Sequence, residues 1–197
     1  MGRGGRPILE RFASALGGLS GVEALVLGGS RARGTHTSDY DLGLYYRGEL
    51  DVQGLRAALA SGGARGEVNQ PCDWGPWING GGWLTCEGRA VDIIYRDQDK
   101  VQRIVHDCLQ GRIELVMQPG HPFGFHTPIY AGELACGQVL WGNIERPDMP
   151  TSCLCQVLFA RNRRWGLKRK GGSGRSGIPE RSPGRLCWNG PRAGVCR

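Results

Sequence analysis

Residues 22–46 read VEALVLGGSRARGTHTSDYDLGLYY, and this stretch decides the fold class. The short apolar run at residues 22–27 predicts a buried strand, which ends abruptly at Gly28-Gly29 in a tight turn. From Asp39 to Tyr46, apolar and aromatic residues occupy every second position, and Asp39 and Asp41 open the other register. That alternation predicts a second strand with one solvent-exposed face.

Helical and strand patterns surround these two strands. Apolar residues recur at helical spacing, and glycines or aspartates mark several ends of the segments. The predicted helices are 7–16, 51–60, 97–109 and 129–136, and the further predicted strands are 89–95 and 113–117, with a Gly- and Trp-rich hairpin or loop at 75–82. We therefore expect an α/β (α+β) fold in which a small mixed sheet carries helices mainly on one face.

Charge divides the chain into a body and a tail. The 197 residues carry a net charge of +7, but residues 1–150 have 14 basic and 17 acidic residues, whereas residues 151–197 have 11 basic residues and one acid. Residues 166–197 are rich in Gly, Arg, Ser and Pro, a composition that buries too little apolar surface to fold. We expect a domain at 5–141, an extension of uncertain character at 142–165 and a disordered basic tail at 166–197. A basic tail on an acidic body is a weak signal for nucleic acid, so nucleic acid is not an expected partner.

Several classes of protein are excluded by simple patterns. No apolar run reaches the roughly 18 residues that a membrane helix needs, so no membrane partner is expected. Residues 1–11 lack the apolar stretch of a secretory signal. The eight cysteines include no C-x-x-C pair, which argues against a zinc ribbon. We expect a cytoplasmic protein whose thiols are reduced.

Three carboxylates form the candidate catalytic centre. Asp39 and Asp41 are two residues apart on a predicted strand, so their side chains project to the same face. Asp92 is the only acid inside another predicted strand. If the two strands are neighbours, the three acids converge, and a hard divalent cation such as Mg²⁺ relieves their mutual repulsion.

The turn before these acids suits phosphate. Gly28 and Gly29 let a backbone approach an anion closely, and a helix that starts near Ser30 offers unpaired N–H groups. Ser30 adds a hydroxyl, and either Arg31 or Arg33 adds a positive charge. A phosphate cradle therefore precedes a metal-binding acid pair by about ten residues.

These motifs resemble the polymerase-beta-like nucleotidyltransferases. That family joins a hydrophobic-Gly-(Gly/Ser) turn to an Asp-hydrophobic-(Asp/Glu)-hydrophobic pattern, here Asp39-Tyr40-Asp41-Leu42, with a third carboxylate on a later strand, here Asp92. The resemblance covers roughly residues 5–141. Among the smaller members, the chain resembles the aminoglycoside nucleotidyltransferases and the minimal nucleotidyltransferases paired with toxins.

The resemblance implies an enzyme of the nucleotidyltransferase class that binds two Mg²⁺ ions. Asp39, Asp41 and Asp92 would hold the metal, with Asp92 as ligand or general base, and Gly28, Gly29, Ser30 and Arg31 would hold the triphosphate. The donor would be a nucleoside triphosphate such as ATP, the acceptor an unidentified hydroxyl on a small molecule or protein, and the leaving group pyrophosphate. Two alternatives stay open: an antitoxin-type enzyme that modifies a partner toxin, and a nucleotide-binding domain without turnover.

Three tryptophans lie among glycines, at Trp74, Trp77 and Trp83. Two roles are consistent with this pattern. The tryptophans either stack on an acceptor or a base, or pack an edge of the fold, and we favour packing.

Overall fold

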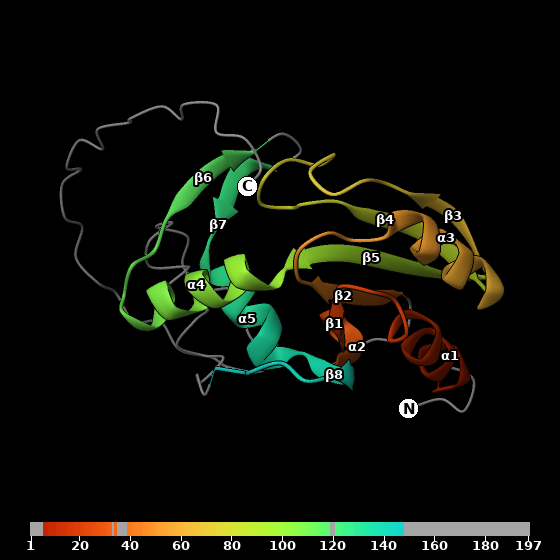
Figure 1. Ribbon diagram of the computed structural model, residues 1–197. Helices are drawn as coiled ribbons and strands as arrows, with labels where there is room; N and C mark the ends of the chain where they lie inside the picture. The colour runs from red at the N-terminus through yellow and green to blue at the C-terminus, as the bar shows by residue number, and fades with distance from the viewer. Residues whose placement is uncertain (1–5, 33, 35–38, 119–120, 148–197) are drawn as a thin grey trace, which may run out of the picture.

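The computed structural model describes residues 6–32, 34, 39–118 and 121–147 (Figure 1). Its centre is a six-stranded sheet with the strand order β3-β4-β5-β2-β1-β8. β2 (Tyr40–Tyr46) runs parallel to β5 (Arg89–Asp97) and antiparallel to β1 (Val22–Leu27). The flanking strands β3 (Ala64–Val68), β4 (Gly81–Cys86) and β8 (Gln138–Gly142) pair antiparallel with their neighbours. The α/β architecture with a mixed sheet is therefore confirmed.

One face of the sheet is covered by α1 (Arg6–Leu16) and α3 (Val52–Ser61). Ile8, Phe12 and Leu16 recur at helical spacing and are fully buried. They pack with Leu55 of α3 in a core that includes the even-numbered side chains of β2 from Tyr40 to Tyr46. Alternation along β2 therefore places this core on one side of the sheet.

The opposite face is covered by α4 (Gln98–Leu109) and α5 (Pro128–Cys136). Val101, Ile104 and Leu134 form a second core with Val26 and Tyr45 of the sheet. The expectation that helices pack mainly on one face is wrong in this detail. Val26 and Tyr45 make the second face apolar near the carboxyl end of β2, and burying them removes that surface from water.

This second layer covers only part of its face. Beyond α4, β6 (Leu115–Gln118) and β7 (His121–His126) form a separate two-stranded sheet (Figure 1). Near the amino ends of β2 and β5, Ala90 is exposed and Asp41 and Asp92 are half-buried. The one-turn helix α2 (Gly29–Ala32) lies beside β2 at this end. The part of this sheet face around Asp41 and Asp92 is therefore left uncovered by α4 and α5. We call it the open half-face, and α2 begins beside it.

Residues of the expected extension also take part in the fold. Ile144 is buried in the second core, and the Arg146 guanidinium donates to the carbonyl oxygens of Leu134 and Ala135 at 3.1 and 2.9 Å. The expected tail at 166–197, and the expected extension from residue 148 onward, lie outside the described residues. Among the helices that the structure describes, none combines the length and apolarity required to span a bilayer.

The cysteines depart from expectation at one position. Cys86 and Cys108 are buried free thiols, but Cys72 is disulfide-bonded. The expectation of reduced thiols is therefore wrong at Cys72, and the argument for a cytoplasmic location loses that support.

Candidate functional site

Asp41 and Asp92 lie directly opposite each other on neighbouring parallel strands. The register of β2 and β5 pairs their Cα atoms, with Leu42 opposite Ile93 on one side and Tyr40 opposite Val91 on the other. Tyr40, Leu42, Val91 and Ile93 belong to the core under α1 and α3. Alternation therefore turns both carboxylates to the other side, onto the open half-face. Asp39 immediately precedes β2 and is exposed.

Asp41 and Asp39 act electrostatically on Asp92. The pKa of Asp92 is raised above its ordinary value, first because burial disfavours the charged form and then because of the negative charges of Asp41 and Asp39. The two acids that are distant from Asp92 in sequence therefore lie close enough to affect its ionisation. A cation or a proton at this position would relieve the repulsion.

The Gly28-Gly29 turn lies against Asp41. The backbone N–H of Gly28 donates to the carbonyl oxygen of Asp41 at 2.7 Å, which ties the end of β1 to β2. Gly29 has φ +61°, and a Cβ added there would lie 1.7 Å from Asp41 Oδ2. Only glycine therefore permits the turn and the Asp41 carboxylate to be this close.

Arg31 binds the segment that leads into β2. Its Nε donates to the carbonyl oxygen of Asp39 at 2.7 Å, and its guanidinium carbon lies 3.9 Å from the centre of the Tyr40 ring. These contacts fix the backbone beside Asp39, a task that the sequence does not indicate. Ser30 lies in α2 and is half-buried.

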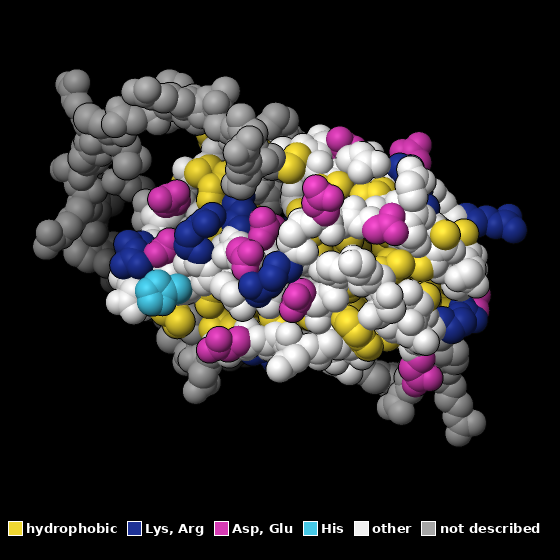
Figure 2. All heavy atoms as spheres, in the orientation of Figure 1, with side chains coloured by type: hydrophobic (Ala, Val, Ile, Leu, Met, Phe, Trp, Pro, Cys, Tyr) yellow, Lys and Arg dark blue, Asp and Glu magenta, His cyan; other side chains and the backbone are white. Residues whose placement is uncertain are grey.

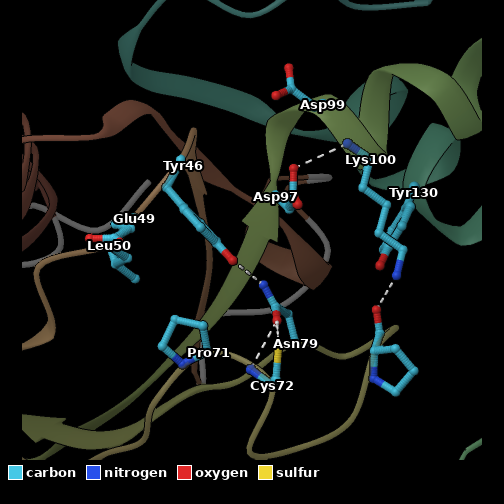
Figure 3. A pocket seen from close by; sticks show the side chains of 12 residues that line it. Tyr46, Glu49, Leu50, Pro71, Cys72, Asn79, Asp97, Asp99, Lys100 and Tyr130 are labelled. Carbon is cyan, nitrogen blue, oxygen red and sulfur yellow. Dashed lines mark hydrogen bonds between the residues drawn. The ribbon is translucent and has the colours of Figure 1, made fainter. Parts of the chain in front are cut away.

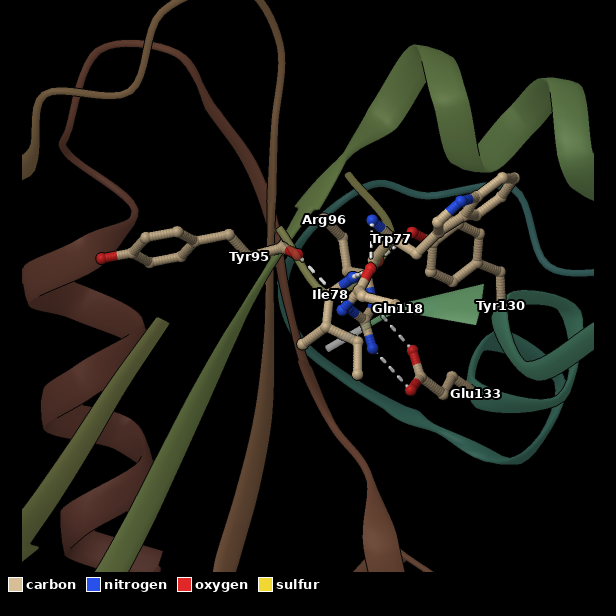
Figure 4. A network of polar contacts seen from close by, with 7 residues as sticks. All are labelled: Trp77, Ile78, Tyr95, Arg96, Gln118, Tyr130 and Glu133. Atoms are coloured by element: carbon tan, nitrogen blue, oxygen red, sulfur yellow. Dashed lines mark hydrogen bonds and ion pairs between the residues drawn. The ribbon is translucent and has the colours of Figure 1, made fainter. Parts of the chain in front are cut away.

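An ion pair that the sequence does not predict lies across a small cavity from the Gly28-Gly29 turn. Arg96 of β5 is almost fully buried and makes two hydrogen bonds to Glu133 of α5, at 2.8 and 2.7 Å (Figure 4). A small cavity of about 70 Å³ separates this pair from the turn, with Gly28, Gly29 and Asp41 in its wall. The partners are 37 residues apart, so only the pairing of β5 and α5 across the second core brings them together.

Residues 9–73 match the family described as Nucleotidyltransferase domain. The match covers about a third of the chain, which over these residues is similar to the nucleotidyltransferases. The matched residues include β1, the Gly28-Gly29 turn and β2 with Asp39 and Asp41, so the family expected from the motifs is confirmed. A search of curated proteins found no match.

The nucleotidyltransferase domain offers oxygen ligands but no closed metal cage. Among residues 6–32, 34, 39–118 and 121–147, no group of three or more His, Cys, Asp or Glu is arranged to hold a metal ion. Mg²⁺ usually binds one or two carboxylates together with substrate phosphates and water. The adjacent Asp41 and Asp92, with Asp39 two residues away, fit that donor chemistry.

A larger cleft lies at the other end of the same strands. It has a volume of about 590 Å³, and its walls include Tyr46 at the end of β2, Asp97 at the end of β5 and Asn79 (Figure 3). The Asn79 side-chain amide donates to the Tyr46 hydroxyl, as the dashed line shows. Asp92 and Asp97 are five residues apart on β5, or about 16 Å along the strand. The cleft is therefore separate from the carboxylates.

Proposed function

We propose that this chain transfers a nucleoside monophosphate from a nucleoside triphosphate, with ATP as the donor to test first, to a hydroxyl on a small molecule or protein. The match to the nucleotidyltransferase domain supports the general reaction. The observation that carries the proposal is the pairing of Asp41 with Asp92 beside the Gly28-Gly29 turn. The donor base, the metal and the acceptor are our inference.

The acidic side chains would bind the metal, and the Gly28-Gly29 turn would bind the triphosphate. Asp39, Asp41 and Asp92 would hold two Mg²⁺ ions, which when bound neutralise phosphate charge and stabilise the attacking and leaving oxygens. The backbone of Gly28 and Gly29, with the Ser30 hydroxyl, would lie against the triphosphate. Arg31 would keep the backbone of Asp39 in place through its 2.7 Å hydrogen bond.

Asp92 is the residue best suited to take a proton. Its carboxylate lies opposite Asp41 and on the side away from the Gly28-Gly29 turn, where an acceptor hydroxyl would have room. In the proposed step the acceptor O–H bond breaks and its proton moves to Asp92. The acceptor oxygen bonds to the α-phosphorus, the bond from that phosphorus to the bridging oxygen breaks, and pyrophosphate leaves.

Release of pyrophosphate tests this proposal. The full chain is incubated with labelled ATP, Mg²⁺ and a panel of small-molecule and protein hydroxyl acceptors. We expect transfer that Asp41→Ala abolishes and Asp99→Ala, in the first turn of α4, leaves unchanged. Transfer to a protein acceptor alone would favour the antitoxin-type activity. ATP binding without transfer to any acceptor would contradict the proposal and favour a nucleotide-binding domain without turnover.

A further inference from the structure

The row of residues that contains Asp41 and Asp92 continues across the sheet to Trp83. In the antiparallel pair of β4 and β5, Trp83 lies directly opposite Asp92, and in the pair of β3 and β4 it lies opposite Glu67. Residues opposite each other in a ladder share a face of the sheet. Asp41, Asp92, Trp83 and Glu67 therefore form one row on the open half-face.

Trp83 is exposed to an unusual degree for so large an apolar side chain. It is 54% exposed, whereas Leu84, the next residue of β4, is buried in the core under α1 and α3. Tryptophan buries a large area when it packs, so a half-exposed ring beside acidic side chains leaves apolar surface in water. Much of the Trp83 ring surface is therefore accessible to a ligand.

A second tryptophan supports the exposed ring. Trp74 and Trp83 stack with ring centroids 5.0 Å apart and an interplanar angle of 24°. Trp74 also lies over Gly81 of β4, where an added Cβ would come within 2.9 Å of its Cζ3. By contrast, Trp77 is half-buried and packs against Phe125 of the second core at a centroid distance of 5.8 Å. Trp74 and Trp83 thus form a supported aromatic surface, which we call the Trp platform.

We propose that the Trp platform binds the acceptor by stacking on an uncharged ring that carries, or is attached to, the reacting hydroxyl. This inference rests on the proposed function. The order across the half-face is the Gly28-Gly29 turn, then Asp41, then Asp92, then Trp83. With the triphosphate at the turn, the side of Asp92 that remains for the acceptor is the side of Trp83.

The size and charge of the row limit the acceptor. Neighbouring strands are about 5 Å apart, so Trp83 lies one strand from Asp92, which suits a single ring with its hydroxyl over the carboxylate. The carboxylates of Asp92 and Glu67 flank the platform and would accept hydrogen bonds from ring hydroxyls, and they repel an anionic ring. Two sources share this chemistry, a free sugar and a nucleoside.

Ligand-observed NMR with small probes tests the platform. Saturation transfer is measured from the full chain to adenosine, to methyl glucoside and to sorbitol, a polyol without a ring. Each probe is used alone and with Mg²⁺ and a non-hydrolysable ATP analogue. We expect at least one ring probe to bind and sorbitol not to bind. Adenosine binding that persists in the presence of the ATP analogue would identify a nucleoside acceptor, and methyl glucoside binding would identify a sugar.

Substitutions in β4 test whether probe binding depends on the Trp83 ring itself or on any change to this strand. Trp83→Ala should weaken binding of the ring probe by about tenfold or more, because the stacked ring loses its partner. Trp83→Phe should keep most of the affinity, and Thr85→Ala, on the same face two residues away, should keep all of it. Failure of both ring probes to bind in both conditions, or equal binding to wild type and Trp83→Ala, would overturn the platform.

The same samples distinguish this inference from the proposed function. If the ring probe binds but the nucleotide analogue does not, the platform stands and the proposed nucleotidyl transfer fails. If the analogue binds with Mg²⁺ but neither ring probe binds, the platform fails and the proposed function stands.

Discussion

Gly29 is the residue at which the proposed phosphate-binding turn meets Asp41, a proposed metal ligand. A Cβ there would lie 1.7 Å from Asp41 Oδ2, and φ is +61°. We expect Gly29→Ala to move the Asp41 carboxylate and to lower pyrophosphate release by about 100-fold, since small displacements of reacting groups cost that much. Kinetic assay with a working acceptor measures the loss.

Gly48→Ala is the matched control. Gly48 has a similar φ of +72°, but no atom lies within 4 Å of a Cβ added there. This variant should share the backbone strain, about 1 kcal/mol, without losing activity. Equal activity losses in both variants would contradict the role assigned to the contact with Asp41.

Asp92 should make stability depend on pH. Its folded-state pKa lies above the ordinary 3.8, because of burial and then Asp41 and Asp39. The folded chain therefore binds this proton more tightly than the unfolded chain, and the free energy of unfolding falls as pH rises from about 4 through the raised pKa. Above that range the ionised Asp92 destabilises the metal-free protein.

Removing this charge should stabilise the metal-free protein. We expect Asp92→Asn to raise Tm at pH 7 and to change it little at about pH 3, which lies below the ordinary 3.8, so that Asp92 is largely protonated in both states. Thermal unfolding in the presence of a chelator measures Tm at both pH values. Glu10→Gln, which removes an exposed carboxylate, is the control. A Tm at pH 7 that is unchanged or lower in Asp92→Asn would show that the carboxylates do not repel one another.

At the scale of elements, α4 begins where β5 ends, and Asp97 makes the transition. Its side chain accepts a hydrogen bond from the backbone N–H of Lys100 at 3.1 Å, as a helix N-cap. Asp97→Ala should lower the free energy of unfolding by about 1 kcal/mol. That corresponds to a Tm lower by about 2–4 °C for a chain of this size.

This variant also tests whether the two ends of β5 are independent. Asp97→Ala should leave nucleotide binding at Asp92 unchanged, and the exposed Gln102→Ala within α4 should change neither property. Denaturant unfolding and nucleotide titration measure the two effects. A cap variant as stable as Gln102→Ala would contradict the capping role.

The elements differ in how far the sequence predicts them. α1, α3 and α4 were predictable because their apolar residues recur at helical spacing, as at Ile8, Phe12 and Leu16. β3 and β4 were not, because Gly66 and the Gly81-Gly82 pair have low strand propensity. Pairing with β5 imposes the strand conformation there, since β-propensity depends on tertiary context.

The candidate site was likewise predictable from the sequence only in part. Strand alternation predicts that Asp39 and Asp41 share a face, but the register that places Asp92 opposite Asp41 is set by long-range pairing. The Arg96–Glu133 pair and the neighbouring position of Trp83 arise from contacts between distant segments, which no local pattern encodes. Residue types were therefore predictable, and their juxtaposition only in part.

At the scale of the whole molecule, the site occupies the part of the sheet that the second helical layer leaves open. α4 and α5 cover the carboxyl ends of β2 and β5, and the carboxylates lie toward the amino ends. On the face seen in Figure 2, acidic and basic side chains are interspersed. Since the described residues of this face form no single-sign patch in Figure 2, we expect recognition of a phosphate-bearing ligand to depend on the local carboxylates and on the cation that they would hold.

Calorimetric titration of the full chain with a non-hydrolysable ATP analogue, with and without Mg²⁺, tests the central claim most directly. We predict binding that requires Mg²⁺, that weakens by about tenfold or more in Asp41→Asn and Asp92→Asn, and that is unchanged in Thr85→Ala. Binding that is independent of Mg²⁺, or equal in wild type and Asp92→Asn, would contradict the claim that Asp41 and Asp92 together hold the metal and the nucleotide.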